Sequence, residues 1–344
     1  MHFTHFSGNK HSTIEKKQMR KLIKQFPNQL LESVEISKGY SISIPSEIKN
    51  VVVCGLGGSG IGGEIIKQWV RLDGNFPVET CHNYTLPGYV NKDSLVIVCS
   101  YSGNTEETLS ALQDALDRDA NIIGVSSGGT LEDVLRENSK HCIKIPGGLP
   151  PRSALAYSLV QLVEIFEQCN LVSTSLKAEV VKSIHLLQYE QAEIESLAAE
   201  LLKRSKSKQV LFYSEESFRP TLLRACQQIN ENSKALSFFN VVPEMNHNEI
   251  VGWASEPKDL FVMFIRSDLE NEANKKRLDI TNKIIEKQTD SMTSVDAIGV
   301  GLVQQTLYLI HLLDWFSLLK AEEKGVDVTE VKIIDFLKSE LAKN

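Results

Sequence analysis

The stretch "VVVCGLGGSGIGGEIIKQWVRL", residues 51–72, joins a short apolar run, a glycine-rich turn and a longer mixed segment. An apolar run of this length that ends in glycines is typical of a strand buried on both faces. We predict a helix in the residues that follow the glycines. This stretch therefore indicates one strand–helix unit of a parallel sheet.

The same alternation continues after this stretch. Strand-like runs occur at 77–81, 94–100, 121–126 and 142–145, with helix-like segments at 105–118 and 130–138. The segment "PGGLPPRS" (146–153) then interrupts the pattern, and Ser153 is a candidate start for a long helix that reaches about residue 168. Alternating strands and helices predict an α/β fold with a doubly wound parallel sheet.

The second half of the chain repeats this plan without visible sequence repetition. Strands are predicted there at 209–214, 235–239, 259–266 and 291–299, and helices at 175–207, 217–230, 268–288, 301–323 and 328–341. A further helix is predicted at 13–35, before the first strand. We therefore expect two parallel-sheet domains flanked by helices. The expected boundaries are 1–39 for an N-terminal helical segment, 40–172 for domain 1, 173–207 for a linker helix, 208–326 for domain 2 and 327–344 for a C-terminal helix.

Length and composition fit two ordinary globular domains. The 344 residues allow two domains of roughly 150 residues each. The net charge of -7 leaves no electrostatic footprint for nucleic acid or an anionic membrane, so local dipoles would have to hold an anionic ligand. No apolar run reaches the ~18 residues needed to span a bilayer. Six scattered cysteines without a CxxC pair indicate a reducing cytoplasm.

The glycine-rich turn has two functional interpretations. Gly55-x-Gly57-x-x-Gly60 matches the dinucleotide fingerprint, and the acid Glu79 follows about twenty residues later. An NAD-binding domain is therefore one alternative. In either interpretation the glycines let the backbone approach a ligand, and the start of the helix favours an anion. Ser59 adds a hydroxyl to this turn.

The stretch "CSYSGNTEETLSAL", residues 99–112, favours a different ligand. Ser100, Ser102 and Thr105 supply three hydroxyls at the end of a strand, and a helix is expected to start near Thr105. One capping hydroxyl would be enough to start that helix. Three hydroxyls with free backbone amides form a nest for a phosphate monoester that needs neither lysine nor metal. A dinucleotide enzyme has no need of this second nest.

Four motifs together carry a family resemblance. They are "GLGGSGIGG" (55–63), "SYSGNTEET" (100–108), "PPRSALAY" (150–157) and "NHNEIVGW" (246–253). The serine-rich motif resembles the phosphate loop of SIS (sugar isomerase) domains, and the four in this order resemble the bifunctional phosphoglucose/phosphomannose isomerase family from about residue 40 onwards. This resemblance implies two SIS domains with five-stranded parallel sheets and a homodimer. It also implies interconversion of glucose 6-phosphate and mannose 6-phosphate with fructose 6-phosphate, without metal or cofactor.

The resemblance also assigns roles to residues of the first domain. It implies that Ser100, Ser102 and Thr105 bind the phosphate and that Gly58 and Ser59 line the sugar. Arg152, in "PPRS", matches the family arginine that stabilises the anionic intermediate.

Two residues of the second domain match the chemistry that such a reaction needs. One base must carry a proton between C2 and C1, and another group must open the sugar ring. Glu231, at the end of a predicted helix, matches the family's catalytic glutamate; His247 suits ring opening because its ordinary pKa lies near 6.5. The nearest other acid, Glu249, is interpreted as a helix-start residue. The resemblance implies that the histidine enters the partner's active site.

Two further assignments come from the C-terminal region. The family lysine that assists at the sugar oxygens matches Lys338 best, and Lys332 is an open alternative. Thr329 is the candidate for the small hydroxyl residue that makes room for either epimer at C2.

Two other functions compete with the isomerase. A non-catalytic sugar-phosphate sensor needs the phosphate nest but no base, so Glu231, His247 and Arg152 argue against it. An NAD-dependent dehydrogenase would use the glycine turn alone. No metal site is expected, because the remaining histidines of the predicted domains lie in separate elements: His82, His141, His185 and His311.

Overall fold

The computed structural model describes residues 11–44, 47–74, 76–341 and 343. The chain divides into two compact units that are described separately. The five-strand unit comprises Gln25–Glu190 and Ala297–Tyr308. The four-strand unit comprises the described residues within Met1–Lys24, Gln191–Asp296 and Leu309–Asn344. The helix α11 (Gly301–Lys324) contributes residues to both.

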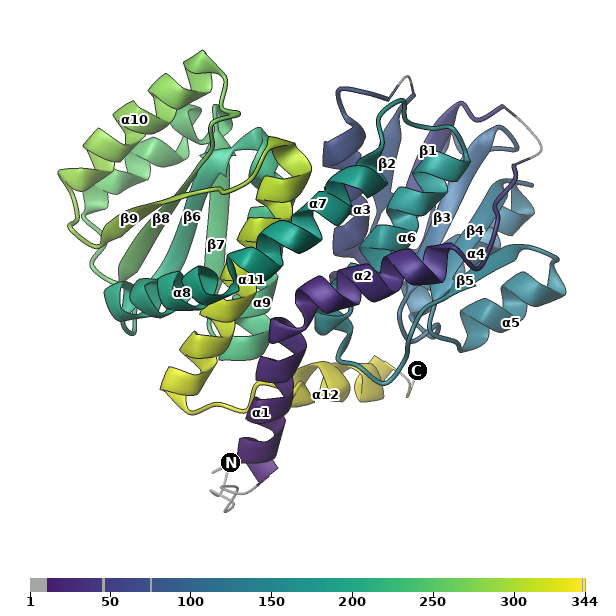
Figure 1. The fold of residues 1–344 in the computed structure, drawn as a ribbon, viewed down its shortest axis with the longest axis horizontal. Coiled ribbons are helices and arrows are strands. Elements are labelled where there is room, and N and C mark those ends of the chain that lie inside the picture. Colours follow the sequence, from purple (N-terminus) through teal and green to yellow (C-terminus); the bar gives the residue numbers. More distant parts are fainter. Residues whose placement is uncertain (1–10, 45–46, 75, 342, 344) are drawn as a thin grey trace. The chain divides into compact units, whose positions relative to one another are not determined.

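The five-strand unit contains one parallel sheet with the strand order β2-β1-β3-β4-β5 (Figure 1). Its elements are α2 (Phe26–Ser37), β1 (Asn50–Cys54), α3 (Gly57–Val70), β2 (Val78–Cys81), β3 (Ser94–Ser100), α4 (Glu106–Asp117), β4 (Asn121–Ser126), α5 (Thr130–Glu137), β5 (His141–Lys144), the 3-10 turn η1 (Pro151–Ser153), α6 (Leu155–Gln168) and α7 (Leu176–Tyr189). The predicted doubly wound sheet is therefore confirmed.

Alternating strand residues separate the two faces of this sheet. Val52, Val96 and Val98 belong to one apolar cluster with the buried side chains of α4 and α5. Val53 points to the other face, where it lies against Gly63 of α3. Every residue of β3 is buried, as expected for the central strand of a sheet covered on both sides.

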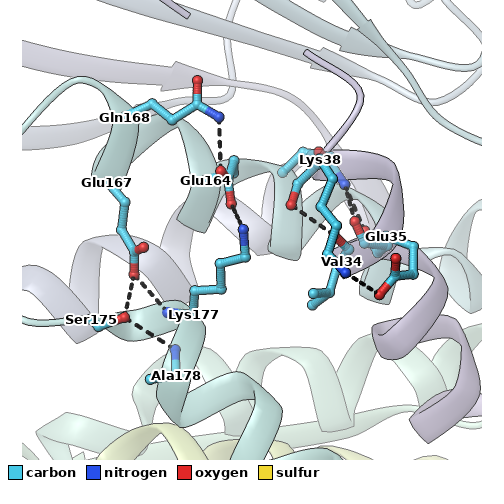
Figure 2. Close-up of polar contacts among 12 residues, drawn as sticks. Val34, Glu35, Lys38, Glu164, Glu167, Gln168, Ser175, Lys177 and Ala178 are labelled. Carbon is cyan, nitrogen blue, oxygen red and sulfur yellow. Dashed lines mark hydrogen bonds and ion pairs between the residues drawn. The ribbon is translucent and has the colours of Figure 1, made fainter. Parts of the chain in front are cut away.

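Polar side chains fix the connection between α6 and α7 (Figure 2). Lys177 Nζ lies 2.8 Å from a carboxylate oxygen of Glu164, and Gln168 donates to the other oxygen at 2.8 Å. Ser175 caps α7 by accepting from the amide of Ala178. Burial acts to raise the pKa of Glu164, but the hydrogen bonds from Gln168 and Lys177 together outweigh it and lower that pKa. These contacts hold helices that cover one face of the sheet.

The four-strand unit contains a second parallel sheet with the order β7-β6-β8-β9 (Figure 1). Its elements are α1 (His11–Lys24), α8 (Gln191–Ser205), β6 (Gln209–Glu215), η2 (Glu216–Phe218), α9 (Arg219–Ser233), β7 (Ser237–Val242), η3 (Glu244–His247), η4 (Glu249–Ser255), β8 (Leu260–Arg266), α10 (Glu272–Glu286), β9 (Met292–Asp296) and α12 (Lys332–Leu341). The resemblance implied five strands here, but the described residues form four.

A buried ion pair joins α9 to α11 within the four-strand unit. Arg224 Nη2 lies 2.6 Å from Asp314 Oδ2, and Gln228 donates to Asp314 Oδ1 at 2.8 Å. Burial raises the pKa of Asp314, while Arg224 and Gln228 act against that rise. Both charged side chains are less than one-tenth exposed. Removing either one would leave the charge of the other buried without this compensation.

Several predicted helix boundaries were wrong for local reasons. The predicted helix 13–35 is two helices, because Pro27 opens α2 and cannot continue the hydrogen-bond ladder of α1. The predicted linker helix is also two helices, and they belong to different units. The long helix after "PPRS" begins at Leu155 instead of Ser153, behind η1.

The remaining boundaries differ less. The C-terminal helix begins at Lys332 rather than 328, because the preceding residues fold around the side chain of Asp327. The domain boundaries 40–172 and 208–326 stay predictions, and residues 1–10 of the N-terminal segment lie outside the described residues. None of the described helices has the length and apolar character needed to cross a bilayer.

Candidate active site

The strand order of the five-strand unit creates a crevice between two loops. β1 pairs with β2 on one side and with β3 on the other. The chain leaves β1 toward α3 on one face and leaves β3 toward α4 on the opposite face. In open α/β sheets, ligands bind at the carboxyl ends of the strands where such a switch occurs. The glycine turn and the serine loop meet at this switch point.

Packing requires most glycines of the first loop. A Cβ at Gly60 would lie 2.4 Å from the carbonyl oxygen of Gly55, and one at Gly63 would lie 2.9 Å from Val53 Cγ1. Gly58 faces the backbone of Pro151, whose carbonyl carbon and oxygen would both be 2.9 Å from its Cβ. The glycines therefore serve close packing, and their number alone does not indicate a ligand.

His82 fixes the first loop from the end of β2. Its Nδ1 lies 2.6 Å from the carbonyl oxygen of Gly55, and its Nε2 lies 2.9 Å from Glu64 Oε1. Because both partners only accept, both contacts are hydrogen bonds only when the imidazole is protonated. The hydrogen bond to Glu64 raises the pKa of His82, and the same bond lowers the pKa of Glu64.

The serine loop leaves the start of α4 open to a ligand. Ser100 Oγ donates to Thr105 Oγ1 at 3.0 Å, and Ser102 Oγ accepts from the amide of Asn104 at 3.2 Å. Thr105 is the N-cap residue, but its side chain makes no capping hydrogen bond. Its hydroxyl therefore accepts no hydrogen bond from the first-turn amides of α4. These amides form the positive end of the helix dipole. Ser102 is exposed at the rim of the loop.

Contacts across the crevice join the predicted residues of this unit. Ser59 Oγ accepts from the amide of Tyr101, which follows Ser100, at 2.9 Å. Gly58, Ser59 and Ser100 line one small cavity together with Pro151. Arg152 follows Pro151 in η1, and only 5% of its surface is exposed. The structure thus brings the glycine turn, the serine loop and the "PPRS" segment together within one unit.

Glu231 lies in the four-strand unit, two residues before the end of α9. Lys234 ends this helix in the left-handed conformation, with φ of 50°, and its Nζ donates to the Glu231 carbonyl. The Glu231 side chain is half-buried. The predicted position at a helix end is confirmed.

His247 ends the 3-10 turn η3, and its side chain is exposed. Its neighbours anchor this turn: Met245 is fully buried, and Asn246 Nδ2 donates to Thr281 Oγ1 at 2.8 Å. A well-anchored backbone therefore presents an exposed histidine to its surroundings.

Glu249, the other acid in this region, is engaged by two neighbours. Tyr213 donates to Glu249 Oε1 at 2.5 Å, and Asn240 donates to Oε2 at 2.6 Å. Glu249 is also the first residue of η4, as the sequence predicted. Its carboxylate therefore ties η4 to β6 and β7.

Within a single chain, the length of β7 separates Glu231 from His247. Glu231 precedes the amino end of β7, and His247 follows its carboxyl end. A strand of six residues spans about 20 Å at ~3.3 Å per residue. The two side chains therefore lie at opposite ends of the same strand.

The C-terminal candidates lie near and within α12. Thr329 donates its hydroxyl to Asp327 Oδ1 at 2.8 Å, and Lys332 pairs with Glu330 at 3.1 Å. Lys338 lies on α12, in which no described residue is buried. The described residues contain no group of three or more His, Cys, Asp or Glu side chains arranged to hold a metal.

Sequence reasoning missed two residues that hold the loops, Tyr101 and His82. Tyr101 stands between Ser100 and Ser102 in a motif that was analysed only for its hydroxyls. His82 was considered only as a possible metal ligand. Both make contacts with residues far away in sequence, which no local pattern records.

Comparison with known proteins identifies the family. A model of the SIS domain matches residues 46–167, and a model of the bacterial phospho-glucose isomerase C-terminal SIS domain matches residues 190–341. A bifunctional phosphoglucose/phosphomannose isomerase of Caldicellulosiruptor bescii is 37% identical over 329 residues, which cover 92% of this chain and 97% of that protein. The enzyme of the same name from Aquifex aeolicus is 34% identical over 299 residues, which cover 86% of this chain and 91% of that protein.

The chain belongs to the bifunctional phosphoglucose/phosphomannose isomerase family. As a member of this family it is an isomerase, and the sensor and dehydrogenase alternatives are set aside. A solved structure supports the fold: the C-terminal domain of glucosamine-fructose-6-phosphate aminotransferase from Francisella tularensis superposes with a TM-score of 0.70 at 16% identity, covering 95% of this chain and 100% of that one. Membership in the phosphoglucose/phosphomannose isomerase family also fits the two parallel sheets described above.

Proposed function

We propose that this protein is a metal-independent aldose–ketose isomerase. It interconverts glucose 6-phosphate, and also mannose 6-phosphate, with fructose 6-phosphate. The reaction proceeds through ring opening and a cis-enediolate. The relatives that carry both activities in their names support this substrate class.

The serine loop is the observation that carries the proposal. It lies at the topological switch point, and its N-cap side chain leaves the first turn of α4 uncapped. Hydroxyls and free amides at a helix start suit a phosphate monoester. Ser100, Ser102 and Thr105 are proposed to bind that phosphate, and Gly58 and Ser59 to line the sugar.

The chemistry needs a base and a nearby cation. Glu231 is proposed to move the proton between C2 and C1, because a carboxylate can accept and return it at the same face. Arg152 is proposed to stabilise the negative charge of the enediolate, since a buried guanidinium beside the sugar site acts in a low dielectric. Lys338 is proposed to assist at the sugar oxygens, and Thr329 to accommodate either epimer at C2.

His247 is proposed to open the sugar ring in the site of a second subunit. Its separation from Glu231 by the length of β7 and its exposure on an anchored turn support this division of labour. The active form is then a homodimer. Mixing subunits that carry Glu231→Gln with subunits that carry His247→Ala should restore activity, because each mixed dimer contains one intact site. Mixtures no more active than either variant would contradict a shared site.

A coupled assay tests the reaction itself. Fructose 6-phosphate is supplied, and glucose 6-phosphate and mannose 6-phosphate are measured separately, with and without EDTA. We expect glucose 6-phosphate to form at the same rate in both conditions. Activity that disappears with EDTA and returns with a divalent cation would overturn the metal-independent mechanism.

A further inference from the structure

Tyr101 connects three loops at the carboxyl edge of the five-stranded sheet. Its backbone amide donates to Ser59 Oγ at 2.9 Å. Its backbone carbonyl oxygen accepts from Ser127 Oγ at 2.6 Å. Its phenol oxygen accepts from the amide of Leu149 at 2.9 Å. The residue between the two candidate phosphate-binding serines thus contacts the loops that follow β1, β4 and β5.

Only the contact with Leu149 depends on the tyrosine side chain. The other two contacts use the backbone and would persist with any residue at this position. The Leu149 amide belongs to the segment "PGGLPP", residues 146–151, whose three prolines have no amide hydrogen to donate. Gly148 adds a left-handed turn, with φ of 81°. A segment with so few donors depends strongly on each hydrogen bond that holds it.

This segment leads directly into Arg152. Pro151 lies against Gly58 so closely that a Cβ there would be 2.9 Å from its carbonyl group. A shift of Leu149 would therefore change how η1 packs on the start of α3. It would also move the Arg152 backbone, from which the guanidinium side chain extends. Burial raises the pKa of the Tyr101 phenol, so the hydroxyl stays neutral and keeps its hydrogen bond at neutral pH.

We infer that Tyr101 is a positioning residue: its hydroxyl holds the 146–151 segment so that Arg152 is preorganised beside Gly58 and Ser59. This inference rests on the proposed role of Arg152 as the cation that stabilises the enediolate. Tyr101 acts through the arginine and does not itself take part in proton transfer.

Tyr101→Phe tests the inference with the smallest possible change. We expect kcat to fall by about 10-fold or more, since misplacement of a catalytic group by about 1 Å costs up to ~100-fold. KM should change by less than about twofold, because the phosphate loop keeps its backbone contacts. Tyr89→Phe is the matched control: the hydroxyl of Tyr89 donates to Glu79 at 2.6 Å, outside the three loops, and its loss should leave kcat unchanged.

A double-mutant cycle separates positioning from a general structural role. If Tyr101 acts through Arg152, adding Tyr101→Phe to Arg152→Ala should lower kcat no further. The inference about Tyr101 would be overturned if the two losses in kcat were additive. It would also be overturned if Tyr101→Phe kept wild-type kcat while Arg152→Ala was impaired. Neither outcome would affect the proposed role of Arg152. Wild-type kcat in Arg152→Ala would instead overturn the proposed role of Arg152.

Hydrogen exchange tests the contact without any variant. Peptides that cover residues 147–153 contain few exchangeable amides because of Pro150 and Pro151, so the Leu149 amide contributes a large share of their signal. We expect this amide to be protected in the wild-type enzyme. Exchange at the rate of an open chain would overturn the inference even if Tyr101→Phe failed to fold.

Discussion

Gly58→Ala should reduce both the free energy of unfolding and the rate of catalysis. The new Cβ would lie 2.9 Å from the carbonyl carbon and oxygen of Pro151, so the backbones of α3 and η1 would have to separate by about 0.5 Å to reach an ordinary contact. Such overpacking costs about 1–3 kcal/mol. The substitution also gains about 0.5–1 kcal/mol, because alanine is a better helix former than glycine. The free energy of unfolding should therefore fall by at most about 2.5 kcal/mol.

The effect on catalysis follows from the same displacement. Arg152 moves with η1 away from the glycine turn that is proposed to line the sugar. Because misplacement of a catalytic group by about 1 Å costs up to ~100-fold, a shift of about 0.5 Å should lower kcat by about 10-fold. Activity is followed by converting fructose 6-phosphate to glucose 6-phosphate in a coupled dehydrogenase assay. Gly88→Ala is the matched control, since a Cβ at Gly88 meets no atom within 4 Å. Wild-type kcat in Gly58→Ala would refute the argument that contact between the two loops sets the site.

Two further predictions concern charged pairs. Glu64 raises the folded-state pKa of His82. The pair with Glu64 and the hydrogen bond to Gly55 therefore stabilise the fold fully below about pH 6.5, the ordinary pKa of histidine. This stabilisation is lost as the pH rises through the folded-state pKa of His82. The difference in Tm between wild type and His82→Asn should therefore shrink from about pH 6 to about pH 9, and a constant difference would contradict this origin. Asp314→Ala leaves Arg224 without its buried carboxylate and should lower the free energy of unfolding by about 3–5 kcal/mol in urea titrations; a loss below about 1 kcal/mol would show that the pair is replaceable.

The sequence predicted strands best where they are buried on both faces. β3 is an uninterrupted apolar run, and its predicted and observed bounds agree. β7 was placed two to three residues too early, because "ALSFFNVV" contains no local signal for where pairing with β6 begins. It is an edge strand with Phe238 exposed, and its register is fixed by Val210 opposite Ser237. Only the folded sheet contains that information.

The candidate site was predictable where its parts are local in sequence. The hydroxyls of the serine loop lie within six residues, so their convergence follows from the turn itself. The contacts of Tyr101 with Ser59 and Leu149 span 42 and 48 residues, and the contact of His82 with Gly55 spans 27. These depend on strand order, which periodicity does not give.

The glycine turn shows the opposite limit. Its composition fitted both a dinucleotide fingerprint and another anion-binding turn, and in each of these the glycines were expected to let the backbone approach a ligand. The structure assigns Gly60 and Gly63 to packing against Gly55 and Val53. A glycine count cannot separate these causes, because each requires the same absence of a Cβ.

Replacement of Glu231 tests the central claim most directly. We predict that Glu231→Gln lowers kcat for fructose 6-phosphate by at least ~100-fold, the usual scale for losing a general base, while sugar-phosphate binding stays near wild type. Glu286→Gln, at the exposed end of α10 in the same unit, is the matched control and should keep wild-type kcat. A Glu231→Gln enzyme with near-wild-type kcat would contradict the assignment of Glu231 as the base that moves the proton between C2 and C1.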